Sequence, residues 1–168
     1  ALVARAEDLS VLRVTGKDRL AWLSGLVTQE ILKLAPGALA YAFLCEKKGK
    51  IVCDMHMFLR DDRILVAVPA AARDAVAATL DHHLIMEDVE VAADYAAVFR
   101  VYGPRAEALA TSLGGGAWAT GAFRLPMGLV LAEGDADAFA ERLADATREH
   151  EAGVAPAGFE DELRVGLG

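Results

Sequence analysis

A β-hairpin over residues 38–60 is the feature that most constrains the fold of this chain. Two apolar runs, 38–45 (ALAYAFLC) and 51–59 (IVCDMHMFL), flank a polar tip that contains Lys48 and Gly49. Glycine supplies the positive φ that such a tip requires.

The register of the hairpin separates its side chains into two unlike faces. A turn at Lys48-Gly49 places Tyr41 opposite His56, Phe43 opposite Asp54, and Cys45 opposite Val52. Successive side chains of a strand point to opposite faces. One face is then core material: Ala42, Leu44, Ile51, Cys53, Met55 and Met57. The other face carries Tyr41, Phe43, Cys45, Val52, Asp54, His56 and Phe58.

Asp54 and His56 are the polar side chains of that second, aromatic face. An acidic side chain surrounded by apolar side chains either has a buried partner or binds a ligand, because an unpaired buried carboxylate is destabilising. The alternative is an acid satisfied by backbone donors beside a half-exposed histidine. Similarly, the basic tip of Lys47, Lys48 and Lys50 either meets an anionic ligand or is a solvated turn.

Helix and strand signals alternate along the rest of the chain. Strands that follow one another directly, with helices between the groups, predict an α+β fold of antiparallel sheets with helices on one side of each. The order strand, helix, strand, strand is repeated along the chain, which suggests two similar lobes. Outside the hairpin, the expected strands are 9–15, 64–68, 89–91, 97–101, 117–123 and 127–131. The expected helical segments are 17–27, 28–34, 71–84, 104–113, 135–150 and 159–165, with a linker at 153–158.

Composition excludes several classes of protein. The chain has 168 residues, of which 55% are hydrophobic and 25% charged, so it is not a disordered chain. Its net charge is −8 and its Lys and Arg are scattered, which disfavours nucleic acid as a partner. It has no apolar run near the ~20 residues of a membrane span. Cys45 and Cys53 fall on opposite faces and form no CxxC, which predicts two reduced thiols, no metal site and a cytoplasmic protein.

Several segments in a fixed order resemble the glycine cleavage T-protein (aminomethyltransferase) superfamily. Each piece is short, and it is their order and spacing that make the resemblance specific. The pieces are VTGKDRLAWLSGLVTQEILKLAPG (14–37), AYAFLCEKKGKIVCDMHMF (40–58), DDRILVAV (61–68), DHHLIMEDVEV (81–91), VYGPRAEAL (101–109) and EDELRVGLG (160–168).

The resemblance implies a folate-binding domain of two entwined antiparallel-sheet lobes with helices on one face of each. The lobes would comprise about 1–95 and 96–168, with strands exchanged between them. A further barrel-like domain would follow downstream of this chain.

The resemblance also implies roles for the second face of the hairpin. Asp54 falls on the carboxylate of the family's motif, which contacts the pterin and is the catalytic acid/base candidate. Tyr41 falls on the tyrosine that lines the same cavity. A carboxylate can accept the N–H donors of a pterin, and Tyr41 and Phe43 can pack its ring. We therefore expect Asp54 as the catalytic residue, and Tyr41, Phe43, Asp54 and His56 as ligands of tetrahydrofolate.

Some positions depart from the family pattern. Val68 stands where the family has Asn, and Tyr102 where it has Gln. The strand T-G-E-x-G-Y-E, whose Glu helps to hold the pterin in aminomethyltransferases, has no counterpart in AFRLPMGLVLAEG (122–134). This loss favours the YgfZ-like branch, which implies iron–sulfur cluster assembly or repair with iron–sulfur apoproteins as partners.

Two alternatives stay open beside that hypothesis. The chain could be an aminomethyltransferase that moves a one-carbon unit to tetrahydrofolate, with an acid from elsewhere replacing the lost Glu. It could also be a non-catalytic interaction domain whose cavity is filled by its own side chains, such as Phe58 or Met127.

Overall fold

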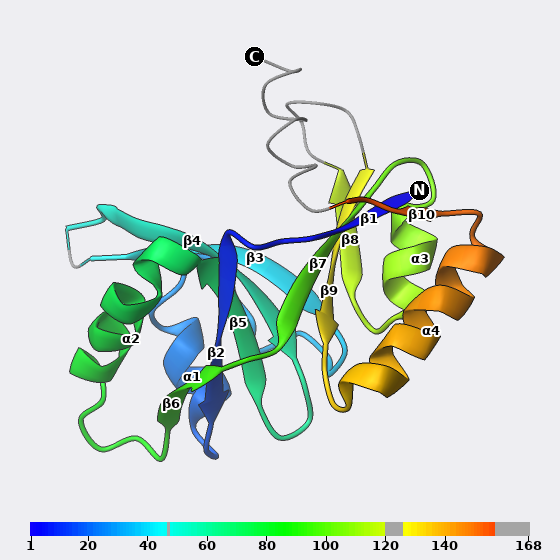
Figure 1. Cartoon of the computed structure of the whole chain (residues 1–168). Helices are drawn as coiled ribbons and strands as arrows, with labels where there is room; N and C mark the ends of the chain where they lie inside the picture. Colours follow the sequence, from blue (N-terminus) through cyan, green and yellow to red (C-terminus); the bar gives the residue numbers. More distant parts are fainter. Residues whose placement is uncertain (47, 120–125, 157–168) are drawn as a thin grey trace. The chain divides into compact units, whose positions relative to one another are not determined.

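A five-stranded antiparallel sheet contains the predicted hairpin at one of its edges (Figure 1). The computed structural model describes residues 1–46, 48–119 and 126–156. They form two units, of which Asp8–Tyr95 is called the hairpin unit here. The other, called the terminal unit, joins Ala1–Glu7 to the chain from Ala96 onward. Two sheets with few helices confirm the α+β class.

The sheet of the hairpin unit has the strand order β3-β4-β5-β2-β6, and all its pairings are antiparallel. β5 is central and almost wholly buried, as its continuous apolar sequence ILVAVP predicts. β2 has the bounds that its β-branched pattern predicts. The strands are β2 (Leu9–Thr15), β3 (Leu39–Cys45), β4 (Ile51–Leu59), β5 (Ile64–Pro69) and β6 (Glu90–Asp94).

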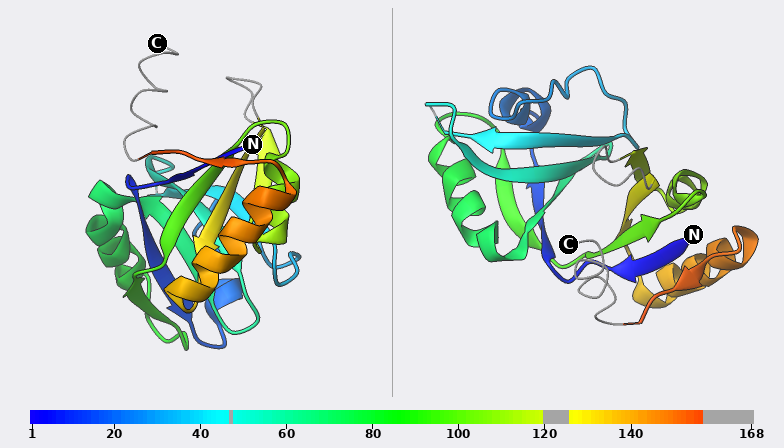
Figure 2. Two further views of the ribbon diagram at one scale, coloured as in Figure 1. Left: turned by 45° about the vertical axis from the view of Figure 1, so that its right-hand side comes forward. Right: turned by 90° about the horizontal axis from the view of Figure 1, so that it is seen from above.

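Both helices of the hairpin unit contribute to one core on one face of its sheet. Figure 2 shows the ribbon from two further directions. The helices are α1 (Arg19–Ser24) and α2 (Arg73–His82), the latter preceded by the 3-10 turn η1 (Ala70–Ala72). Trp22 and Leu23 of α1 and Val76 and Leu80 of α2 join the buried strand residues in one core. The opposite face of the sheet is therefore clear of both helices, and it is the face that carries Asp54.

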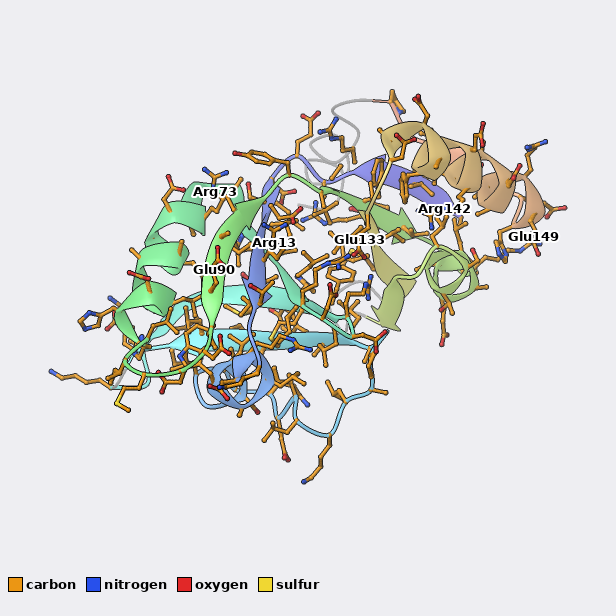
Figure 3. All side chains as sticks on the ribbon, turned by 90° about the horizontal axis from the view of Figure 1, so that it is seen from below. Arg13, Arg73, Glu90, Glu133, Arg142 and Glu149 are labelled. Carbon is orange, nitrogen blue, oxygen red and sulfur yellow. The ribbon has the colours of Figure 1, made fainter. Side chains whose placement is uncertain are left out.

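The sheet of the terminal unit has the order β10-β1-β7-β9-β8. Helices α3 and α4 supply Leu109 and Phe139 to its core. Asp135 caps α4 as predicted, because its carboxylate accepts from the backbone N–H groups of the next turn. On α4, the Arg142 guanidinium lies 5.4 Å from the Phe139 ring (Figure 3). The elements are β1 (Leu2–Arg5), β7 (Ala97–Tyr102), α3 (Ala106–Ser112), β8 (Gly116–Ala119), β9 (Pro126–Ala132), α4 (Ala136–Glu149) and β10 (Gly153–Val154).

The predicted helical turn at 28–34 is wrong. Val27 bridges Leu44 of β3, and the chain then passes through turns, one closed by the Leu34 N–H on the Ile31 carbonyl at 3.1 Å. Ile31 and Leu34 have the spacing of a helix, but Ile31 is buried in the core by an irregular segment.

Other differences concern short elements. The sequence predicted no strand at β1, and it predicted a linker where Gly153 and Val154 pair in parallel with β1 as β10. Residues 120–123 of a predicted strand and the predicted helix 159–165 lie outside the described residues. No helix in the described ranges is long and apolar enough to cross a membrane.

Candidate functional site

The β3–β4 hairpin has the predicted register over its central part. Tyr41 pairs with His56, and Phe43 pairs with Asp54. Near the tip the register shifts, so that Cys45 pairs with Ile51 and not with the predicted Val52. The reason is that the turn closes between Glu46 and Lys50, which leaves Val52 as an extra residue on β4.

The core face of the hairpin is as predicted, with one exception. Ala42, Leu44, Cys53, Met55 and Met57 are all buried. Ile51 is 54% exposed, because the bulge separates it from the alternation of β4.

Four predicted ligand-binding side chains lie together on the other face. The Tyr41 hydroxyl donates to Asp54 Oδ2 at 3.3 Å. The Tyr41 ring lies 5.4 Å from the Phe43 ring at 71°, and 4.9 Å from the His56 ring at 44°. Tyr41 is 45% exposed, so the cluster is open to a ligand at its phenol. The structure thus places the carboxylate, the phenol and two further rings side by side, and their role stays a prediction.

The charge of Asp54 acts on both faces of β4. Burial raises the pKa of Tyr41, and the Asp54 charge and the hydrogen bond to it raise it further. The Tyr41 phenol is therefore protonated at neutral pH and acts as a donor. Burial, and after it the Asp54 charge, raises the pKa of Cys53 to about 11.

Thr28 holds the outer edge of β3, the strand that carries Tyr41. The Phe43 N–H donates to Thr28 Oγ1 at 3.0 Å, and the Thr28 N–H donates to the Phe43 carbonyl at 3.0 Å. Because β3 is an edge strand, these bonds satisfy backbone groups that the sheet leaves open. Thr28 was not among the predicted site residues, because the pattern of residues 28–34 predicted a helical turn. The β-branched pair Val27-Thr28 is the signal that could have found it.

The cysteines and acids of the described residues suggest no metal centre. No group of three or more His, Cys, Asp or Glu side chains able to hold a metal ion occurs there. Cys45 and Cys53 are both free thiols, and Cys53 lies in the core.

The family model of the GCVT N-terminal domain matches residues 3–127 of this chain. The chain belongs to this family. The match covers the whole hairpin unit, with the four clustered side chains, and part of the terminal unit. The predicted resemblance to the glycine cleavage T-protein superfamily is thereby confirmed, whereas the YgfZ-like branch stays a prediction.

The curated relatives of this GCVT-type domain include two kinds of protein. The aminomethyltransferase of Bacillus subtilis (strain 168) is 29% identical over 102 residues, which are 60% of this chain and 28% of the relative. That of Anoxybacillus flavithermus is 33% identical over 97 residues, 56% of this chain and 26% of the relative. The tRNA-modifying protein YgfZ of Vibrio vulnificus is 25% identical over 105 residues, which are 62% of this chain and 32% of the relative. The chain thus spans about a third or less of these relatives' length.

Solved structures share the fold of this GCVT-type domain. The glycine cleavage system aminomethyltransferase T from Bartonella henselae superposes with a TM-score of 0.66 at 18% identity, over 92% of this chain and 47% of that one. A chain of the heterotetrameric sarcosine oxidase from Corynebacterium sp. U-96 gives a TM-score of 0.50 at 18% identity, over 92% of this chain and 87% of that one. At these identities the likeness shows the fold alone.

Proposed function

We propose that the GCVT-type domain binds tetrahydrofolate on the second face of its β3–β4 hairpin. The observation that carries the proposal is the Tyr41–Asp54 hydrogen bond of 3.3 Å amid aromatic rings. A carboxylate is an acceptor with room for several donors, and Tyr41 occupies only Oδ2. Among the described residues, no donor reaches the other oxygen of Asp54.

The pterin ring of a folate offers what this face can receive. Its amide and amino N–H groups lie on one edge and can donate to a single carboxylate. Its flat ring can pack against Tyr41 and Phe43, and aromatic pairs of this kind contribute about 0.5–1.5 kcal/mol beyond area burial. His56 adds a polar ring next to Tyr41. Asp54 is also the group placed to accept or return a proton if the domain catalyses a transfer.

Isothermal titration calorimetry of the chain with 5-formyltetrahydrofolate tests the proposal. Asp54→Asn should weaken binding about 10- to 100-fold, because hydrogen bonds to a charged group contribute about 1.5–3 kcal/mol. Asp61→Asn is the matched control, since Asp61 is an exposed acid in the next turn of the same sheet. Absence of binding, or equal affinity of Asp54→Asn and wild type, contradicts the proposal.

The biological role that we propose first is support of iron–sulfur cluster assembly or repair. One ground is that the sequence of residues 122–134 lacks the motif T-G-E-x-G-Y-E of aminomethyltransferases. The other is the similarity to YgfZ, a protein whose own name refers to tRNA modification. Iron–sulfur enzyme activity in cells that lack this protein should be restored by wild type and not by Asp54→Asn. Equal activity with and without the protein contradicts this role.

Aminomethyl transfer to tetrahydrofolate is the second candidate. Four relatives named aminomethyltransferase, at 29–33% identity, favour it. The assay is formation of methylenetetrahydrofolate from an aminomethyl donor. Activity that Asp54→Asn abolishes would select this function over the first. A chain that binds no folate would instead be a non-catalytic interaction domain.

A further inference from the structure

The loop between α2 and β6 presents two large apolar side chains to solvent. This loop, residues 83–89, is called the α2–β6 loop here, and Figure 1 shows it below α2. Ile85 is 85% exposed and Met86 is 92% exposed, and the two are called the apolar pair here. Leu84, directly before them, is partly buried against the core of the hairpin unit. The fold therefore anchors the loop with one apolar side chain and leaves the next two outside the core.

A carboxylate of the α2–β6 loop holds the backbone of the apolar pair. Glu87 Oε2 accepts from the Ile85 N–H at 2.9 Å and from the Met86 N–H at 3.0 Å. Hydrogen bonds from backbone N–H groups to an ionised carboxylate are stronger than those between neutral groups. The two residues are thus fixed from within the loop, although neither side chain belongs to the core.

Both ends of the α2–β6 loop are bound to α1 and its N-cap. At the start of the loop, Trp22 Nε1 donates to the His83 carbonyl at 3.2 Å. Near its end, the Asp88 N–H donates to Asp18 Oδ2 at 2.8 Å, and the Asp18 N–H donates to the Asp88 carbonyl at 3.3 Å. The loop is therefore a fixed turn that presents the apolar pair in one arrangement.

The surroundings of the apolar pair are acidic. Residues 74–95 contain six Asp or Glu and no Lys or Arg. Three of the six acids form ion pairs with Lys or Arg: Asp74, Asp88 and Asp94. The other three lie within four residues of the apolar pair: Asp81, Glu87 and Glu90. Within residues 1–46, 48–119 and 126–156, none of these three forms an ion pair, so their negative charge is available to a partner.

We propose that the α2–β6 loop docks into an apolar pocket on another protein, a pocket whose rim carries Lys or Arg. A few well-buried side chains at the centre of an interface supply most of its affinity, and the apolar pair forms such a centre. Because the loop is already fixed, it loses little conformational freedom on binding. The three acids complement a basic rim, whereas a second copy of this chain brings the same charges and an anionic membrane repels them. The inference is independent of folate binding.

Photo-crosslinking followed by calorimetry tests the inference. The photoreactive residue p-benzoylphenylalanine takes the place of Met86 in cells that produce the protein, and mass spectrometry identifies the crosslinked protein and its crosslinked residue. The purified partner is then titrated with the chain. Ile85→Ser/Met86→Ser should weaken binding at least about 10-fold, as the loss of central contacts does. Asp81→Asn/Glu90→Gln, which leaves the Glu87 hydrogen bonds intact, should weaken it about 3-fold at about 50 mM salt and less at about 300 mM.

Leu32→Ser is the matched control, because Leu32 is a 54% exposed apolar side chain of the same unit outside the loop, and this variant should bind as wild type does. The loop variants should keep the urea midpoint of wild type, since the substituted side chains are exposed. A partner that binds Ile85→Ser/Met86→Ser as tightly as wild type overturns the inference. Crosslinking only to a second copy of the chain, only to lipid, or to nothing overturns it as well. A partner whose crosslinked surface has no Lys or Arg, or whose affinity does not respond to salt, also overturns it.

Discussion

Cys53 allows the geometry around Asp54 to be tested without any ligand. The thiol is 7% exposed and lies on the core face of β4, and burial and the adjacent Asp54 charge raise its pKa from 9.0 to about 11. At pH 8 the thiolate fraction falls from about one in ten to about one in a thousand, a change of about 100-fold. Alkylation proceeds through the thiolate, so native Cys53 should react at least about 100-fold more slowly than an ordinary thiol.

The rate of iodoacetamide alkylation, followed by mass spectrometry in a Cys45→Ser variant, measures this effect on Cys53 alone. The same variant unfolded in guanidinium chloride gives the rate of the unprotected thiol. Native and unfolded rates within about 10-fold of each other would refute the assignment of Cys53 to a buried position beside a negative charge.

The same pKa shift predicts a loss of stability at alkaline pH. Because the folded pKa lies above the unfolded one, the contribution of Cys53 is fully present below pH 9 and is lost as pH rises through 11. The loss amounts to about 2 kcal/mol at pH 10.5. It is measured by urea unfolding of wild type and Cys53→Ala at pH 8 and 10.5, since other titrations cancel between the two proteins. A stability difference between them that does not change with pH refutes the reasoning.

Asp54→Asn separates the charge from burial as causes of this shift. Removing the charge should lower the pKa of Cys53, so the thiol should be alkylated faster than in the parent Cys45→Ser protein. Asp61→Asn should leave the rate unchanged. Equal rates in all three proteins would show that the Asp54 carboxylate does not reach Cys53, and would weaken the case for a site at this strand.

Four further substitutions test the site and the fold around it. Asp54→Asn should lower the pKa of Tyr41, because the negative charge that helps to raise it is lost, and an absorbance titration of the phenols measures this. Gly16→Ala should lower the free energy of unfolding by about 3 kcal/mol or more, since φ is +101° and the new Cβ would lie 2.0 Å from a backbone carbonyl oxygen. Gly37→Ala, at φ +91° with nothing within 4 Å, should cost only about 1 kcal/mol by the same urea unfolding. Thr28→Val should weaken folate binding about 5-fold through loss of one hydrogen bond, while Thr28→Ser keeps the affinity.

The sequence predicted best those parts of the fold that local signals determine. The alternation of β3 and β4 around a glycine turn is enough to place Tyr41, Phe43, Asp54 and His56 on one face. The cap of α4 by Asp135 and the bounds of β2 rest on equally local patterns. The bulge at Val52 escaped prediction because it depends on where the turn closes, and a one-residue difference there leaves the pattern of the strands unchanged.

Elements that depend on distant partners could not be read from their own residues. β1 is four residues long, and β10 has two, Gly153 and Val154. Neither length nor composition distinguishes such segments from a loop. They become strands because β1 pairs with β7, nearly a hundred residues away in the chain, and thereby offers its other edge to β10.

Thr28, next to the candidate site, also depends on a partner that is distant in the sequence. The spacing of Ile31 and Leu34 fits a helix as well as an irregular segment that inserts both into the core, so periodicity could not decide between them. What decides is the open edge of β3, where the N–H and the carbonyl of Phe43 need partners and find both in Thr28. Thr28 therefore stabilises β3, the strand that carries Tyr41, by completing the hydrogen bonds at the open edge of the sheet. The segment next to an edge strand is therefore determined by the unpaired N–H and carbonyl groups of that strand as much as by its own periodicity.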